Sequence, residues 1–128
     1  MNLTATDPPR PFICGVEDAV TMYDTGHLAL ADNEQVTFTT TAGGEYDVAR
    51  KSWGFYATPS LNGRLLRFGL HAALVRNTKQ QWFVMLVEDG GEAEFEAYLD
   101  SERLEVVAWL DSTERLAALE HALGVEVA

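Results

Sequence analysis

Forty consecutive residues, 48–87, contain no aspartate or glutamate, although the chain has twenty acidic residues and a formal net charge of −11. The same segment holds six of the nine lysines and arginines, together with six aromatic side chains. Charged carboxylates are rarely buried, so a long segment without them suits the interior of a fold. Cations beside aromatic rings also suit the binding of an anionic group. Residues 48–87 are therefore predicted to form either the inner body of the fold or an anion-binding region.

Short strand-forming segments alternate with turn signals in the first two thirds of the chain. Residues 35–40 alternate apolar and polar side chains and are rich in β-branched residues, which favours a half-buried strand. Gly43-Gly44 is a hairpin signal, and residues 45–50 can return beside the first segment. This pattern predicts antiparallel pairing.

Two more hairpins are predicted from turn residues alone. Asn62-Gly63 tolerates the positive φ angles of a type I′ turn, so residues 53–60 are expected to pair with residues 64–76. A turn at residues 24–26 is expected to join the two strand-forming segments on either side of it.

The last third of the chain changes to helical spacing. Residues 92–101 predict an amphipathic helix, and residues 104–110 form an apolar run typical of a buried strand. A capping-box pattern that starts at Asp111 predicts a second helix, which Gly124 would end. The predicted fold class is therefore α+β: an antiparallel β meander or small barrel of about six to eight strands with two C-terminal helices.

The length of 128 residues fits one domain, residues 1–128, and three prolines predict an extended N-terminal lead-in over residues 1–11. No apolar run reaches the roughly 18 residues of a membrane span, and no signal peptide is recognised. Cys14 is the single cysteine, which excludes an internal disulfide. These features predict a cytoplasmic protein without a membrane partner.

The net negative charge opposes binding to nucleic acid, because the phosphate backbone repels the protein as a whole. A local basic cleft can still bind a small anion, since charges are screened beyond about 10 Å at ordinary salt. The three histidines are widely spaced, and no metal-binding or nucleotide-binding motif is present. The sequence therefore predicts no metal site and no cofactor.

The segment 50–64 combines cations, aromatic faces, hydroxyl groups and an amide within fifteen residues. Aromatic rings stack on sugar faces, while cations hold anionic groups. Its candidate ligand-binding residues are Arg50, Lys51, Trp53, Tyr56, Asn62 and Arg64. In the alternative interpretation, the rings belong to the core and the cations lie on a solvated strand end.

Arg67 and His71 complete the candidate set, because two-residue strand periodicity over residues 64–76 places them on one face. Gly69 lies between them and would leave room for a ligand near the backbone. The opposite face would be core, and it would carry Leu66, Phe68, Leu70, Ala72 and Leu74. In the alternative interpretation, Arg67 and His71 lie on a solvated sheet face.

Three segments carry a resemblance to known proteins: YDVARKSWGFYATPSLNGRL at 46–65, FGLHAALVRN at 68–77 and FVMLVE at 83–88. They resemble a group of small bacterial proteins found among genes for surface-polysaccharide or nonulosonic-sugar biosynthesis. That group has no established activity, so the resemblance implies no catalytic residues. It implies a setting in which an anionic sugar would be a natural ligand.

Three functions follow as hypotheses. The first is a binding or accessory module for an anionic carbohydrate or nucleotide sugar in bacterial polysaccharide biosynthesis. The second is a protein–protein interaction partner, either of a biosynthetic enzyme or of a second copy through an exposed strand at residues 53–58. The third is a small isomerase or hydrolase with His71 and Tyr56 as proton-transfer groups. The sequence leaves open whether the protein is an enzyme.

Overall fold

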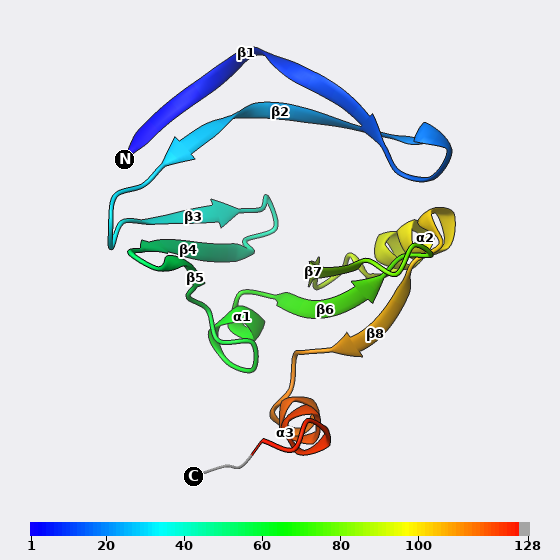
Figure 1. Ribbon diagram of the computed structural model, residues 1–128. Helices are drawn as coiled ribbons and strands as arrows, with labels where there is room; N and C mark the ends of the chain where they lie inside the picture. The colour runs from blue at the N-terminus through cyan, green and yellow to red at the C-terminus, as the bar shows by residue number, and fades with distance from the viewer. Residues whose placement is uncertain (126–128) are drawn as a thin grey trace. The chain divides into compact units, whose positions relative to one another are not determined.

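The computed structural model describes residues 1–125. Within this part of the chain, eight strands form three antiparallel sheets (Figure 1). In chain order the elements are β1 (Asn2–Cys14), the 3-10 helix η1 (Val16–Asp18), β2 (Val20–Ala29), β3 (Gln35–Thr39), β4 (Glu45–Lys51), β5 (Gly54–Ala57), α1 (Arg64–Arg67), β6 (Leu70–Arg76), β7 (Trp82–Glu88), α2 (Glu92–Glu102), β8 (Glu105–Trp109) and α3 (Thr113–Ala122). The predicted α+β class is confirmed.

The chain forms two compact units, which are described one at a time. The first unit comprises Met1–Phe38 and Asp47–Thr58. The second unit comprises Thr39–Tyr46 and the chain from Pro59 onward.

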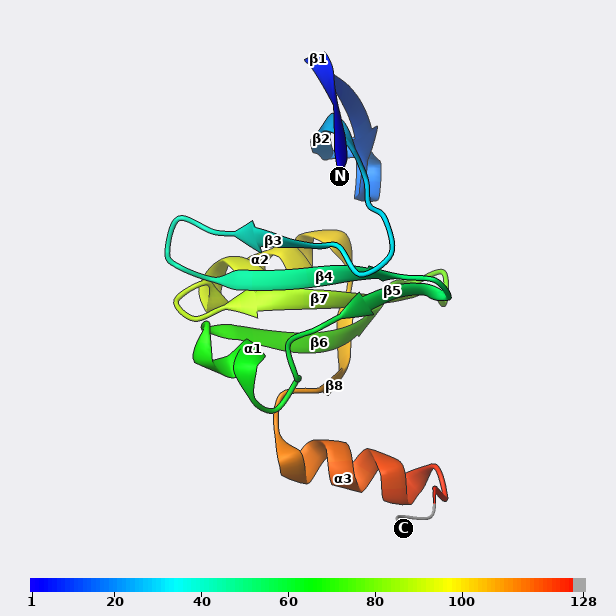
Figure 2. The same cartoon turned by 90° about the vertical axis from the view of Figure 1, so that its left-hand side faces the viewer.

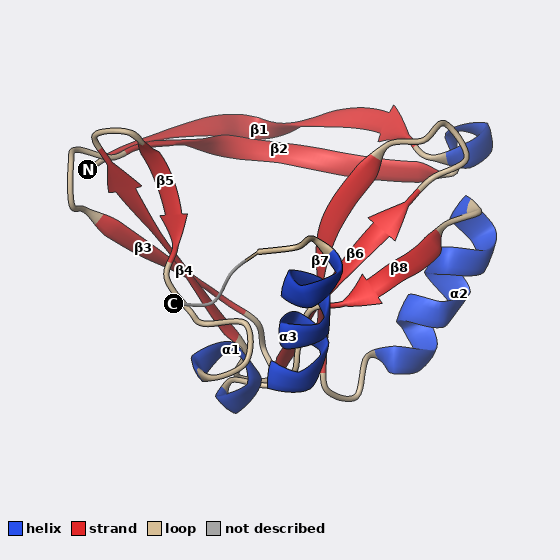
Figure 3. Cartoon of the chain, turned by 60° about the horizontal axis from the view of Figure 1, so that its bottom comes forward, coloured by secondary structure: helices blue, strands red, loops and turns tan. Residues whose placement is uncertain are grey.

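In the first unit, β1 and β2 form a two-stranded antiparallel sheet (Figure 3). Most of their side chains are exposed. The predicted hairpin at residues 24–26 is wrong, because this turn signal lies inside the continuous strand β2. Gly26 is needed there for another reason: a Cβ atom at this position would lie 2.6 Å from the carbonyl oxygen of Thr4 on β1. The register of the pair shifts between Ala5 and Arg10. Prolines in that interval lack amide donors and cannot continue the ladder.

The hairpin predicted over residues 35–50 is confirmed as β3 and β4, which form a sheet in the order β3-β4-β5. The hairpin predicted around Asn62-Gly63 is wrong. β5 pairs with β4, from Val48 opposite Ala57 to Lys51 opposite Gly54, and not with the chain after residue 63. Residues 61–63 instead form a turn that leads into α1, whose first amide, at Arg64, is capped by the Ser60 hydroxyl.

In the second unit, β6 is the central strand of a sheet with the order β7-β6-β8 (Figure 2). The single long strand predicted over residues 64–76 is wrong, because α1 occupies its first part and Gly69, with φ of +75°, separates α1 from β6. Leu65, which the expected alternation places on the same face as Arg67 and His71, is completely buried. The helix breaks the two-residue alternation, so the expected core face did not form as a single stripe.

Both faces of β6 are covered. One hydrophobic cluster contains Leu65, Leu70 and Ala72, and the other contains Ala73, Val75 and Leu99. A strand that is buried on both faces has a continuous run of apolar residues. Alternation along β6 therefore cannot distinguish a core face from a solvent face.

The elements of the last third are confirmed as α2, β8 and α3. The capping residue of α3 differs from the prediction: the Ser112 hydroxyl accepts from the amide of Arg115, so Ser112 is the N-cap. The side chain of Asp111 is directed to other partners. Among residues 1–125, every helix is too short or too polar to cross a bilayer, and α2 has only 11 residues.

Candidate functional site

The candidate site lies in the second unit, where β6 begins, β8 has just ended and the turn after β7 begins. His71 is on β6, opposite Val87 of β7. The amide of Leu110 donates to the carbonyl of Ala72 at 2.8 Å, which brings the residue after Leu110 beside His71. The amide of Asp89 donates to the carbonyl of Gly69 at 2.8 Å, which brings Asp89 close from the other side.

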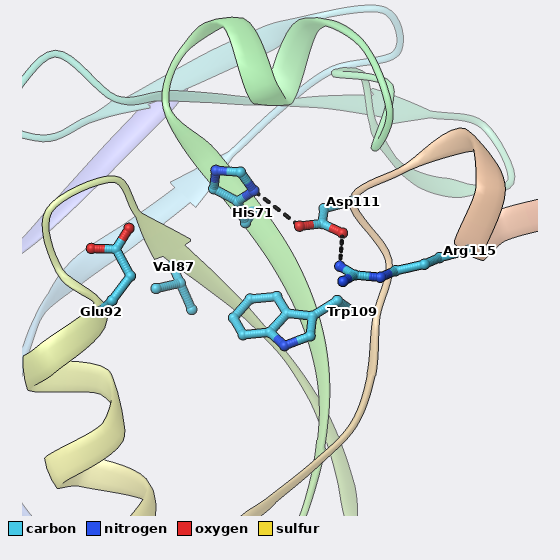
Figure 4. Close-up of a pocket in the computed structure, with 6 residues that line it drawn as sticks. All are labelled: His71, Val87, Glu92, Trp109, Asp111 and Arg115. Carbon is cyan, nitrogen blue, oxygen red and sulfur yellow. Dashed lines mark hydrogen bonds and ion pairs between the residues drawn. The ribbon is translucent and has the colours of Figure 1, made fainter.

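His71 interacts with two carboxylates. Its Nδ1 lies 3.0 Å from Oδ2 of Asp111, and its Nε2 lies 2.7 Å from Oδ1 of Asp89. The other oxygen of Asp111, Oδ1, accepts from Nη1 of Arg115 at 2.7 Å (Figure 4). Four charged side chains thus form a chain in the order Asp89, His71, Asp111, Arg115.

The surroundings of the His71 imidazole favour its protonated form. An ionised carboxylate only accepts hydrogen bonds, so both ring nitrogens of His71 donate when the two carboxylates are ionised. Burial by itself lowers the pKa of His71, but the hydrogen bonds and charges of Asp111 and Asp89 outweigh burial and raise that pKa above its usual value. Burial would raise the pKa of Asp111, but hydrogen bonds from His71 and Arg115 bring it below its usual value.

A pocket of about 260 Å³ opens beside this chain of charges. Its lining consists of His71, Val87, Glu92, Trp109, Asp111 and Arg115. The Trp109 ring packs against Phe95 in an edge-to-face contact, with the ring centroids 5.9 Å apart. Figure 4 shows the Trp109 indole below His71, between Val87 and Arg115. The pocket therefore offers one indole ring, an imidazole, a guanidinium and carboxylates to a small ligand.

Gly69 lies next to the outer carboxylate of the site, that of Asp89. A Cβ atom on Gly69 would lie 3.4 Å from Oδ2 of Asp89, and the φ of Gly69 is +75°. This backbone conformation is one that L-residues with side chains rarely adopt. The positive φ is therefore the reason for glycine at position 69, since the spacing to the Asp89 side chain is an ordinary van der Waals contact.

Four of the eight predicted site residues belong to the first unit. Nη1 of Arg50 donates to the carbonyl of Gly54, and Nζ of Lys51 donates to Oδ1 of Asn33 at 2.7 Å. Trp53 and Tyr56 are exposed, which contradicts the alternative interpretation that placed these rings in the core.

The other four predicted residues belong to the second unit, and His71 is the one of them that lines the pocket. Nδ2 of Asn62 donates to Oγ1 of Thr113 at 3.0 Å, which connects the turn before α1 to α3. Arg64 and Arg67 begin and end α1. The expectation that Arg67 and His71 share a strand face is wrong, because α1 and Gly69 separate them.

Sequence reasoning missed Asp89, Trp109, Asp111 and Arg115 as site residues. The sequence pattern predicted Asp111 only as the start of a capping box. Their signal was the strand register: β6 pairs with β8 at Ala73 opposite Trp109, and continuing this register by two residues places Asp111 opposite His71. With that strand pairing known, Trp109 and Asp111 could have been predicted to lie near His71.

Within residues 1–125, no group of three or more His, Cys, Asp or Glu side chains is arranged to hold a metal ion. No protein-family model, curated protein or solved structure matches the chain. The chemistry of the site must therefore be inferred from its own residues.

Proposed function

We propose that the protein is a binding or accessory module for a carbohydrate ligand, which occupies the pocket beside His71. The observation that supports this most directly is the Trp109 ring, which lies in one pocket with His71, Asp111 and Arg115. A sugar has an apolar face of C–H groups and a rim of hydroxyl groups. An aromatic ring suits the face, and charged donors and acceptors suit the rim.

The size of the pocket limits the ligand. Typical ligand pockets span roughly 300–1,000 Å³, and this one, at about 260 Å³, is slightly smaller. One sugar ring is a better match to this volume than an oligosaccharide. A larger nucleotide sugar would place its sugar in the pocket and leave its nucleotide outside.

Two cations in the pocket support the anionic carbohydrate or nucleotide sugar of the first hypothesis. The two carboxylates favour the protonated form of His71, and Arg115 presents a planar set of donors that matches carboxylate or phosphate. The setting in bacterial polysaccharide biosynthesis is part of this proposal and comes from the resemblance of residues 46–88.

Tryptophan fluorescence can test the proposal, because Trp109 lies in the pocket while Trp53 and Trp82 are exposed. In a Trp53→Phe, Trp82→Phe background, Trp109 is the remaining reporter. We expect glucose, glucuronate or UDP-glucose to change its emission in a saturable way. His71→Ala should weaken this response, whereas Lys79→Ala, on the turn after β6, should leave it unchanged.

Carbohydrate binding is refuted if none of these ligands gives a saturable change at about 10 mM, which is roughly tenfold above a weak Kd of 1 mM. Circular dichroism of each variant would show that a lost response is not caused by unfolding.

A second candidate, self-association or a protein partner, is supported by the exposed apolar side chains of β1 and β2. Leu3, Ile13, Met22 and Tyr23 are all exposed, although an isolated two-stranded sheet is only marginally stable. Light scattering after size-exclusion chromatography would test self-association. A dimer that Ile13→Asp converts to monomer would support it, and a monomer at all concentrations would exclude a homodimer.

The isomerase or hydrolase hypothesis stays a prediction. His71 lies in the pocket, but its proposed proton-transfer partner Tyr56 belongs to the first unit.

A further inference from the structure

We propose that the Asp89 carboxylate occupies the place of a ligand's acid group, so that the pocket selects acidic sugars by exchanging Asp89 for the ligand at Nε2 of His71. This inference rests on the proposed carbohydrate function and names its ligand class: a monosaccharide that carries a carboxylate or a phosphate.

The two carboxylates that hold His71 differ sharply in environment. The Asp111 side chain is 15% exposed and also accepts from Arg115, whereas the Asp89 side chain is 63% exposed. Exposed ion pairs contribute little to stability, while buried hydrogen-bonded charges are held firmly. Asp111 therefore fixes the orientation of the imidazole, and Asp89 is the partner that can leave.

The backbone around Asp89 allows such a movement. Asp89 is followed by Gly90, with φ of +89°, and by Gly91, which precedes α2. Glycine lets the chain change its φ and ψ angles at low steric cost. A rotation of the Asp89 side chain toward water would expose Nε2 of His71 without disturbing Nδ1.

The charges of the site favour exchange over simple addition of an anion. The groups that face His71 and the pocket are Asp89, Glu92, Asp111 and Arg115. With His71 protonated, these groups and His71 together carry one net negative charge, so a further anion would be repelled. If Asp89 rotates away, a ligand carboxylate restores the pairing of His71 at Nε2, while Arg115 stays paired with Asp111.

A neutral sugar cannot make this exchange. A hydroxyl group that replaced Asp89 would leave the imidazolium without a charged partner on Nε2. A hydrogen bond between two charged groups is stronger than one to a neutral hydroxyl, so the exchange would weaken the interaction of His71. The pocket should therefore bind glucuronate or glucose 1-phosphate more tightly than glucose.

The decisive variant is Asp89→Asn in the Trp53→Phe, Trp82→Phe background. Ligand binding is measured at pH 6 from the emission of Trp109. Removing the competing carboxylate should tighten glucuronate binding about fivefold, the fold-change that corresponds to one exposed ion pair. Glucose binding should stay the same. The matched control is Glu92→Gln, which also removes one acid from the pocket but makes no hydrogen bond to His71. Its effect on glucuronate should be clearly smaller.

Glucose 1-phosphate separates the two acid groups: a larger gain for glucuronate than for the phosphate in Asp89→Asn would assign the pocket to sugar carboxylates. The inference is overturned if Asp89→Asn tightens glucose as much as glucuronate, or if Glu92→Gln has the same effect as Asp89→Asn. In either result carbohydrate binding itself would stand. If neither sugar binds to either protein, the proposed function fails and the inference fails with it.

Discussion

The Asp111 carboxylate is the residue on which the geometry of the site depends most, and Asp111→Asn measures its contribution. The change keeps the shape of the side chain. It leaves one carbonyl acceptor for two donors, Nδ1 of His71 and Nη1 of Arg115, and places an NH2 group against one of them. Both cations then lose their shared charged partner.

The expected cost can be worked out from the two interactions. The hydrogen bond with His71, which is one-third exposed, belongs near the lower end of the range for charged groups, about 1.5 kcal/mol. The pair with Arg115, which is 56% exposed, contributes about 0.5 kcal/mol, as surface ion pairs do. Asp111→Asn should therefore lower the free energy of unfolding by about 2 kcal/mol. Asp89→Asn, at an exposed carboxylate, should lower it by less than about 1 kcal/mol.

The cost should also depend on pH. Because the folded-state pKa of His71 is raised, its stabilising contribution is complete below the ordinary value of 6.5 and is lost as pH rises through the folded-state pKa. Because the folded-state pKa of Asp111 is lowered, its contribution is present above the ordinary value of 3.8 and is lost as pH falls through the folded-state pKa. The difference between wild type and Asp111→Asn should be largest between these two values.

Urea unfolding with linear extrapolation, repeated at pH 5, 6, 7 and 8, gives the required free energies. An NMR titration of the His71 ring should show its pKa falling in Asp111→Asn. The reasoning is refuted if Asp111→Asn costs no more than Asp89→Asn, or if its cost is the same at pH 5 and pH 8.

Three further changes test the structure around the site by urea unfolding. Leu65→Ala leaves a cavity at a completely buried position and should lower the free energy of unfolding by about 2–5 kcal/mol. A loss below about 1 kcal/mol would mean that Leu65 is not in the core. Gly69→Ala should lower the free energy of unfolding by about 1–2 kcal/mol because φ is +75°; an unchanged stability would contradict this backbone conformation. Ser112→Ala removes the N-cap of α3 and should cost about 1 kcal/mol, whereas Ser101→Ala, on α2, should cost less; equal costs would argue against the cap.

Local signals in the sequence predicted the parts of the fold that depend on neighbouring residues. The β3–β4 hairpin, α2, β8 and α3 each have their turn, spacing or cap within a few residues. Asn62-Gly63 shows the limit of such signals, since the same two residues suit a hairpin turn and the entry to a short helix. In the folded chain the helix places Leu65 at a completely buried position, and this burial cannot be seen from the two turn residues alone.

The site was predictable only at His71. Its partners Asp89 and Asp111 lie 18 and 40 residues away in sequence and reach it through the register of β6 with its two neighbours. No periodicity within one segment encodes which strands will pair. The arginines and aromatic rings at residues 50–67 were predicted as site residues because they are concentrated in one segment. Their concentration in the sequence does not indicate which side chains a sheet brings together.

The centre of the second unit is built on its smallest side chains. Ala72 and Ala73 are consecutive, completely buried, and belong to opposite clusters on the two faces of β6. A methyl group on each face lets the packed layers approach the strand closely, and the carbonyl of Ala72 holds the chain just before Asp111. A bulkier side chain at position 72 would have to displace Leu65 or Leu70, so it would strain the strand that carries His71.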